Sequence, residues 1–372
     1  MSENQEKAQP LPLSRAIAAL KTMFVADALA MPVHWYYSRR DIERAFPGGV
    51  KKMENAPSFH PSSIMSLHST THGGRHSIHS LEPKRQIVGD VILKGRGQFW
   101  GQQNIHYHHQ MKAGENTLNA QCARVLIRSM ITSGGKYDKS HFLDAYIDFM
   151  TAEVPRHSDT YAESYHRGFF ANYVSGKAKD KCGALTHDTP SVGGLVTIAP
   201  IAIVESLRGV ALDNIQSICR NHLYLTHPDQ GLAKICDDYV ELIVALLTRE
   251  ENTNPKDLIA ATSQKSVFIN LENLVSKACN DFDVVGNQFS TACYISESWP
   301  SLLFLSYKYI DQPSEALIVN TNLGGDNVHR GIVLGIILGL SSGRTIDRLF
   351  NQLVCKEDIS SEIEELLATI SK

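Results

Sequence analysis

Apolar residues recur at intervals of three and four along most of the chain after residue 115, and this spacing constrains the fold more than any other feature. The same spacing marks residues 13–31, which are rich in alanine and leucine and end at Pro32. It places apolar side chains on one face of an α-helix, and proline ends a helix because it lacks an amide hydrogen. Further helices are predicted over residues 117–130, 141–150, 161–173, 193–207, 213–222, 230–248, 271–278, 291–307, 331–340 and 359–370.

No strand pattern competes with these helices, although residues 86–93 alternate in a way that is compatible with a strand or an edge ribbon. The chain has 372 residues, and no Gly/Ser-rich linker or change in composition divides it. We therefore expect an all-α fold, with residues 11–372 forming a single compact multi-helical domain of about a dozen helices. Residues 1–10 are polar and are predicted to form a flexible N-terminus.

Charge and cysteine content limit the partners and the location. Lys and Arg number 36 against 39 Asp and Glu, so no basic excess exists to bind nucleic acid. The uninterrupted apolar stretches, such as residues 332–340, fall short of the ~20 residues that span a bilayer, so no membrane partner is expected. Seven scattered cysteines without a CxxC pair are typical of reduced thiols in the cytoplasm. A small-molecule substrate remains as the expected partner, and nothing in the sequence indicates the oligomeric state.

The strongest candidate for a functional site is the motif GGDNVHR, residues 324–330. Two glycines and an acid before an apolar segment mark a helix N-terminus, where free amides favour an anion or a capping carboxylate. A capped helix is one interpretation, and three glycines spaced by four would also let another backbone approach closely: Gly331, Gly335 and Gly339. A functional site is the other interpretation, because four different polar groups share one helical turn: Asp326, Asn327, His329 and Arg330.

A second polar helix start, with the sequence GENT, offers oxygen ligands from Glu115, Asn116 and Thr117. Mg²⁺ or Ca²⁺ accepts such ligands, although polar residues at a helix start are more often ordinary caps. Asp27 lies within the first apolar helix, so its carboxylate is either exposed or held by a hydrogen-bond donor. His34 follows this helix and is either a general base or a packing histidine.

Residues 47–111 show neither helical nor strand periodicity, and we interpret them as a long functional loop. Zinc needs three or four convergent ligands, and no cysteine lies near this loop. The simpler interpretation is that its histidines are polar loop residues, some of which line a pocket. His106 and His108 precede the GENT segment, and we expect them at the same cleft. The loop contains many histidines: His60, His68, His72, His76, His79, His106, His108 and His109.

At these residues the sequence resembles the ADP-ribosylglycohydrolase superfamily, and the similarity covers nearly the whole chain. ADALAMP, residues 26–32, matches a GDALG-like helix, and GGDNVH, residues 324–329, matches a GGDTDT motif. IAPI, residues 198–201, and THPD, residues 226–229, match two further family features. The amino-acid sequences of several segments resemble those of the branch that contains the J-type lens crystallins and selenoprotein J. The resemblance implies an all-α fold that uses two Mg²⁺ ions to cleave N- or O-glycosidic bonds to ADP-ribose.

The sequence departs from the family at the metal motifs. The family's TDDT motif falls on GENT, where Glu115 is the one acid retained. Asp326 remains in the second motif, but Val328 stands where the next aspartate belongs and His329 replaces the threonine. His34 replaces a glutamate found in many members. Two neighbouring Mg²⁺ ions need carboxylates to offset their repulsion, so we expect no certain cofactor and at most one weakly bound Mg²⁺, held by Glu115 and Asp326.

These observations predict a hydrolase that acts on a small glycosidic or nucleotide-like substrate in a rebuilt, metal-poor site. The alternative is a non-catalytic binding or structural member of the fold, similar to a crystallin. Catalytic roles are predicted for His34, Glu115 and His329, with His34 or Glu115 as the general base. Substrate-binding roles are predicted for a second group: Asp27, His106, His108, Asn116, Thr117, Asn327 and Arg330.

Overall fold

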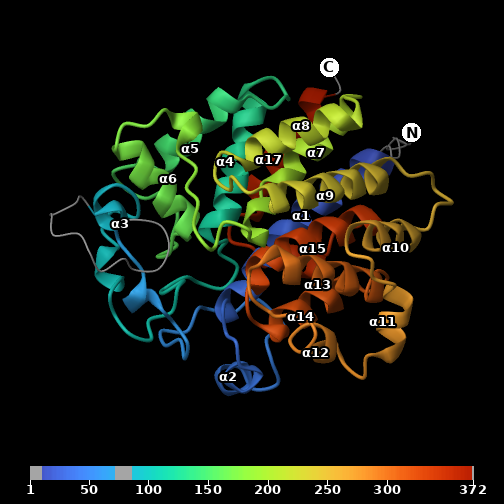
Figure 1. Cartoon of the computed structure of the whole chain (residues 1–372), viewed down its shortest axis with the longest axis horizontal. Coiled ribbons are helices and arrows are strands. Elements are labelled where there is room, and N and C mark those ends of the chain that lie inside the picture. The colour runs from blue at the N-terminus through green and yellow to red at the C-terminus, as the bar shows by residue number, and fades with distance from the viewer. Residues whose placement is uncertain (1–10, 72–85, 371–372) are drawn as a thin grey trace, which may run out of the picture.

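The computed structural model describes residues 11–71 and 86–370. Within these residues the protein has seventeen α-helices and no β-strand (Figure 1), so the all-α, compact fold predicted from the sequence is confirmed. The expected flexible N-terminus, residues 1–10, lies outside the described residues, as do three of the loop histidines: His72, His76 and His79.

Helices in the first two thirds of the chain form the upper part of the molecule in Figure 1, apart from α2. Their bounds are α1 Leu11–Ala30, α2 Arg39–Ala45, α3 Ile87–Asp90, α4 Leu118–Thr132, α5 Lys139–Thr151, α6 Ser164–Val174, α7 Ile198–Leu207, α8 Leu212–Leu223 and α9 Gln230–Thr248. The remaining bounds are α10 Pro255–Ser266, α11 Leu271–Lys277, α12 Asp281–Val284, α13 Ile295–Lys308, α14 Pro313–Leu323, α15 Asn327–Ser342, α16 Asp347–Phe350 and α17 Lys356–Ile370.

Every segment predicted as a helix contains one, and α9 has the predicted bounds. The sequence pattern misses the longer helices α10 and α14, because their buried faces include polar side chains such as Ser263, Asn320 and Thr321 that interrupt the apolar spacing. Residues 86–93 form α3 and a tight turn rather than a strand. Gly89, with a φ of 101°, reverses the chain there, and its amide donates to the carbonyl of Ile92 at 2.8 Å.

Helices α1 and α15 lie side by side at the centre of the fold (Figure 1). The close approach predicted from the spaced glycines is confirmed, because a Cβ atom on Gly339 would lie 2.5 Å from Ala19 Cα, and one on Gly335 would lie 2.8 Å from Thr22 O. Both separations are too short for a side chain. The glycines therefore let the two helix backbones touch, and this contact aligns the C-terminal end of α1 with the N-terminal end of α15.

One described segment, Leu11–Val33, is long and apolar enough to cross a membrane by length and composition alone, with a mean hydropathy of 1.6. Uninterrupted apolar stretches do not reveal this segment, because Lys21 and Asp27 interrupt it. In the structure 89% of its most apolar window is buried inside the protein. The segment therefore forms a buried core helix of the fold.

The chain after α1 is tied to the turn before α15 by backbone hydrogen bonds. Gly325 donates its amide hydrogen to Tyr36 O at 2.8 Å, and its carbonyl accepts from the Trp35 amide at 2.8 Å. Gly325 has a φ of 63°, and a Cβ atom there would lie 2.1 Å from Thr291 O. Only glycine fits this position, and the resulting pairing brings His34 next to Asp326.

Candidate active site

Asp326 is the centre of a buried polar cluster at the N-terminus of α15. Its Oδ1 atom lies 3.1 Å from His34 Nε2 and 2.6 Å from His329 Nδ1. Asp326 and His34 are fully buried. Burial opposes the ionisation of Asp326, but the charge of His329 and the bonding of both imidazoles outweigh it, so the pKa of this carboxyl lies far below its usual range.

His329 links Asp326 to a second carboxylate, that of Glu163. Its Nε2 atom lies 3.6 Å from Glu163 Oε1 and 2.6 Å from Asn119 Nδ2. Burial disfavours the imidazolium form, but the two carboxylates favour it more and raise the pKa of His329 to about 9. His329 is therefore held between two acids.

Behind Asp326 the cluster continues into the segment before α4. His34 Nδ1 lies 2.7 Å from His108 Nε2, and His108 Nδ1 lies 2.8 Å from Asp159 Oδ1. Asp159 also accepts a hydrogen bond from the Leu118 amide at 2.7 Å. Burial opposes ionisation of Asp159, but the charge and hydrogen bond of His108 prevail, and its pKa is lowered to about 2. Burial lowers the pKa of His34 to about 3, so its ring is neutral.

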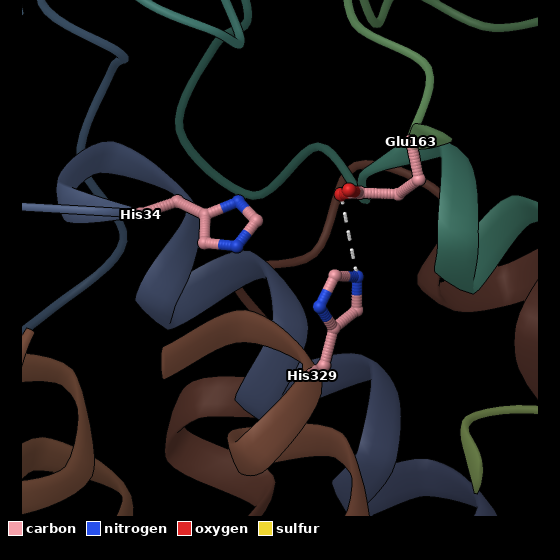
Figure 2. A group of neighbouring side chains, drawn as sticks. All are labelled: His34, Glu163 and His329. Atoms are coloured by element: carbon pink, nitrogen blue, oxygen red, sulfur yellow. Dashed lines mark ion pairs between the residues drawn. The ribbon is translucent and has the colours of Figure 1, made fainter. Parts of the chain in front are cut away.

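Glu163 is a member of the cluster that the sequence analysis missed. It occupies the N-cap position of α6, and its side chain is 12% exposed. Burial raises its pKa to about 7, and Oε1 has no hydrogen-bond partner. Figure 2 shows the Glu163 carboxylate and the two imidazoles of His34 and His329 directed at a common space from three different elements. The polar start of the helix predicted over 161–173 is the signal that could have drawn attention to Glu163 and Asp159.

A cavity of about 350 Å³ opens above this cluster, a size that suits a small organic ligand. Asp326, His329 and Glu163 belong to its lining, whereas His34 lies behind Asp326. Aromatic and small polar residues make up much of the remaining wall, including Trp35, Tyr107, Tyr161, Tyr165, Tyr294, Ser164 and Ser191.

Trp35 reaches the cavity through a rarely adopted backbone conformation. Its φ is 61°, in the left-handed region that bulky side chains seldom occupy. The hydrogen bond to Gly325 holds this conformation. The indole then stacks on the His34 ring with 4.0 Å between centroids and meets Tyr107 edge-on at 4.5 Å. Such local strain is concentrated at functional sites in proteins.

Three residues predicted to bind substrate satisfy one another instead. Asp27 accepts hydrogen bonds from Asn116 Nδ2 at 2.8 Å, from the Thr117 amide at 2.8 Å and from Thr117 Oγ1 at 2.6 Å. Asn116 also donates to the carbonyl of Phe24 at 2.8 Å. Asp27 is fully buried, so the alternative that its carboxylate is exposed is excluded. This group fastens α4 to α1, and none of the three lines the cavity.

Three further predicted substrate-binding residues also hold the backbone. Asn327 donates to Thr321 O at 2.9 Å, and the fully buried Arg330 donates to Asn320 Oδ1 and Gly324 O, each at 2.8 Å. His106 Nε2 lies 3.1 Å from the carbonyl of Pro32. These polar groups satisfy carbonyls in turns next to the site, so their side chains are not directed at a ligand. His108, the last residue predicted to bind substrate, contacts His34 and Asp159 and does not line the cavity.

Glu115 does not lie at the catalytic and metal-binding position that the sequence predicts. Its carboxylate turns back to accept a hydrogen bond from the Lys112 amide at 2.6 Å, which caps a turn. Glu115 does not line the cavity that contains Asp326. Asp326 and His329 therefore share one cavity, and Glu115 does not join them.

A sequence model of one protein family, described as ADP-ribosylglycohydrolase, matches residues 8–368 of the chain. The chain belongs to the ADP-ribosylglycohydrolase family. Among solved structures it is similar to a protein described as "ADP-ribosylglycohydrolase-related protein complex", with a TM-score of 0.56 and 15% identity. That match covers 96% of this chain and 99% of the other, and it supports the fold. No curated protein sequence matches the chain.

The residues of this ADP-ribosylglycohydrolase family member do not fit a pair of Mg²⁺ ions. Both oxygens of Asp27 are occupied by donors from Asn116 and Thr117. Val328, at the position of a second aspartate, is fully buried and has no oxygen to offer. Asp326 directs Oδ1 at two imidazoles, and nitrogen donors of this kind do not suit magnesium. The site therefore lacks the free oxygen ligands that a pair of Mg²⁺ ions requires.

Proposed function

We propose that the protein is a hydrolase that cleaves a glycosidic bond in a small, nucleotide-like substrate bound in the cavity above Asp326. The observation that carries this proposal is the composition of the cavity, which combines aromatic walls with a buried floor of two carboxylates and an imidazole. Aromatic walls favour a planar ring such as a nucleobase. Family membership supports a hydrolase-like fold with the same class of chemistry.

The floor has the groups that glycoside hydrolysis requires. Cleavage of a glycosidic bond builds positive charge on the sugar, which a nearby ionised carboxylate such as Asp326 stabilises. Glu163 Oε1 has no hydrogen-bond partner and is free to accept a proton from the attacking water. His329, paired with both acids, holds them in place.

A non-catalytic member of the fold is the second candidate, as in the branch that holds the J-type lens crystallins. It is favoured by one observation: the polar residues at the family's first metal motif are saturated by mutual hydrogen bonds that serve stability. Under this alternative the cavity binds a ligand or stays empty, and no turnover occurs.

We also propose a cytoplasmic location, no nucleic-acid or membrane partner, and no tightly bound magnesium pair. All seven cysteines are free, which suits a reducing compartment. The net charge of -3 gives no attraction for phosphate backbones. If one weak Mg²⁺ binds, it has to use Asp326 without the turned-away carboxylate of Glu115.

The test combines binding with turnover. ADP-ribose should raise the melting temperature of the protein, because a ligand that binds the native state stabilises it. Release of ADP-ribose from ADP-ribosylated peptides should then fall roughly 100-fold or more in Glu163→Gln, which removes the proton acceptor. Glu115→Gln is the matched control, since an amide oxygen can still accept the Lys112 amide. Full turnover in Glu163→Gln, or no response to any glycosidic probe, would overturn the proposal.

A further inference from the structure

Three side chains at the floor of the cavity and directly behind it have the arrangement of metal ligands. His34, Glu163 and His329 each direct one ligand atom so that the three atoms lie within 4.8 Å of one another (Figure 2). In a tetrahedral zinc site with bonds of about 2.1 Å, ligand atoms are separated by roughly 3.4 Å. His329 Nε2 and Glu163 Oε1 are already 3.6 Å apart. Small side-chain movements are therefore enough to close the group around one ion.

Both imidazoles have a buried partner at Nδ1, so an ion would bind at the Nε2 atoms in place of their present contacts with Asp326 Oδ1 and the Asn119 amide. His329 Nδ1 is paired with Asp326 Oδ1 at 2.6 Å. His34 Nδ1 contacts His108 Nε2 at 2.7 Å, and His108 is in turn held by Asp159. Metal-binding histidines characteristically use the second ring nitrogen in this way, because the outer partner fixes the ring and raises its basicity.

The proton count along this chain calls for a cation at His34 Nε2. If each ring carries one proton, His108 donates from Nδ1 to Asp159, and His34 must donate from Nδ1 to His108. His34 Nε2 then directs a lone pair at Asp326 Oδ1, only 3.1 Å away. Two lone pairs at that distance repel, and either an extra proton or a metal ion would relieve the repulsion.

Unpartnered buried oxygens are an independent sign of a missing ligand. Asp326 is fully buried and lines the cavity, yet its Oδ2 atom has no hydrogen-bond partner, and Glu163 Oε1 has none either. Buried polar atoms in native proteins nearly always have partners, so two orphans on one small floor call for an explanation. A divalent cation bound to Glu163 Oε1 would satisfy that atom and would bring positive charge close to the carboxylate of Asp326.

We propose that His34 Nε2, His329 Nε2 and one oxygen of Glu163 bind a single Zn²⁺ ion, with a fourth position open to the cavity. Two imidazoles and a carboxylate are a ligand set that zinc accepts at catalytic sites and magnesium does not favour. Binding displaces the proton of His329 and the Asn119 amide that now lies 2.6 Å from its Nε2 atom.

A zinc site accounts for the joint appearance of His34 and His329 at positions where the sequence departs from the family. His34 and His329 stand at positions where the resemblance places oxygen-bearing residues, so the same changes that remove magnesium ligands supply two nitrogen ligands. A water molecule in the open position would be acidified by the ion. The second oxygen of Glu163 remains available to that water, which is compatible with the hydrolysis proposed above, although zinc binding does not depend on that activity.

The experiment is titration of the tag-free, chelator-treated full chain with ZnCl₂ and, separately, MgCl₂, by calorimetry. We expect one Zn²⁺ per chain and no comparable heat from Mg²⁺. Co²⁺ should give the visible absorption of a four-coordinate site, because cobalt reports coordination geometry. Glu163→Gln and His329→Gln should each weaken Zn²⁺ binding roughly 100-fold or more, whereas His141→Gln, which lines a different cavity, should not.

Three results would overturn the proposal. The first is the absence of Zn²⁺ binding, which would leave an extra proton on the hydrogen-bonded pair of His34 and His108. The second is binding that survives in the Glu163→Gln, His329→Gln double variant. The third is a loss of binding in His141→Gln equal to that in the site variants. If His329→Gln fails to fold, Glu163→Gln decides, because its partly exposed side chain at the start of α6 is easier to replace. Zinc binding without hydrolysis would refute only the proposed function.

Discussion

Acid should destabilise this protein through its buried neutral histidines, and His222 on α8 is the clearest case. Its side chain is buried at 4% exposure, and its Nε2 and Nδ1 atoms lie 2.9 Å from Thr197 Oγ1 and 3.0 Å from Tyr137 OH. A neutral ring satisfies both contacts, with one donor and one acceptor. Burial lowers the pKa of His222 to about 3, against about 6.5 for an exposed histidine.

The sign and size of the effect follow from this difference. Between pH 6.5 and about 3 the unfolded chain binds a proton at this histidine and the folded chain does not, so stability falls as the pH drops through 6.5. From about pH 7.5 to about pH 5.5 the loss is ~1.4 kcal/mol for one such group. His227, with a pKa lowered to about 3, adds a similar loss. Glu163, with a raised pKa, opposes it over part of the range.

Urea unfolding at these two pH values measures the effect. The difference in unfolding free energy between the two pH values should shrink by ~1.4 kcal/mol in His222→Gln, because glutamine does not titrate. Tyr137→Phe is the matched control, since it removes the same hydrogen bond but keeps the imidazole. It should lower stability at both pH values and leave their difference unchanged. An unchanged difference in His222→Gln would refute the assignment of His222 as a buried neutral group.

Three other outcomes test the roles assigned to single residues. Gly339→Ala should lower stability by about 1–3 kcal/mol, because its Cβ atom would overlap Ala19; an unchanged melting temperature would contradict the close helix contact. Arg330→Lys should lose about 2 kcal/mol or more, because lysine cannot bond Asn320 Oδ1 and Gly324 O together, whereas a purely substrate-binding role predicts no change in melting temperature. Asn116→Asp should destabilise the protein at neutral pH, because it places a second carboxylate beside Asp27. If millimolar Mg²⁺ fails to restore the melting temperature of this variant, the added carboxylate does not recreate a magnesium site.

The sequence by itself determined the helical fold, because helix periodicity is a local property of neighbouring residues. The predicted helix at 230–248 coincides with α9 for this reason. The spaced glycines after Arg330 likewise predicted a close helix contact, because a helix face without side chains lets another helix backbone approach closely. Local sequence patterns do not predict α14, because buried Asn320 and Thr321 interrupt its apolar spacing. Asn320 donates to Asn327 O at the start of α15, a partner outside its own helix.

Only the tertiary structure decided which polar residues form the site. His34 and Asp326 are 292 residues apart and meet because α1 and α15 pack backbone to backbone. Asp27 and Arg330 look equally reactive in the sequence, yet packing directs them at donors and carbonyls that consume their hydrogen-bonding capacity. Glu163 carries no motif and becomes part of the site because the start of α6 faces the same cavity. Hydrogen-bond saturation and cavity access are properties of long-range packing, and a local pattern of residue types does not contain them.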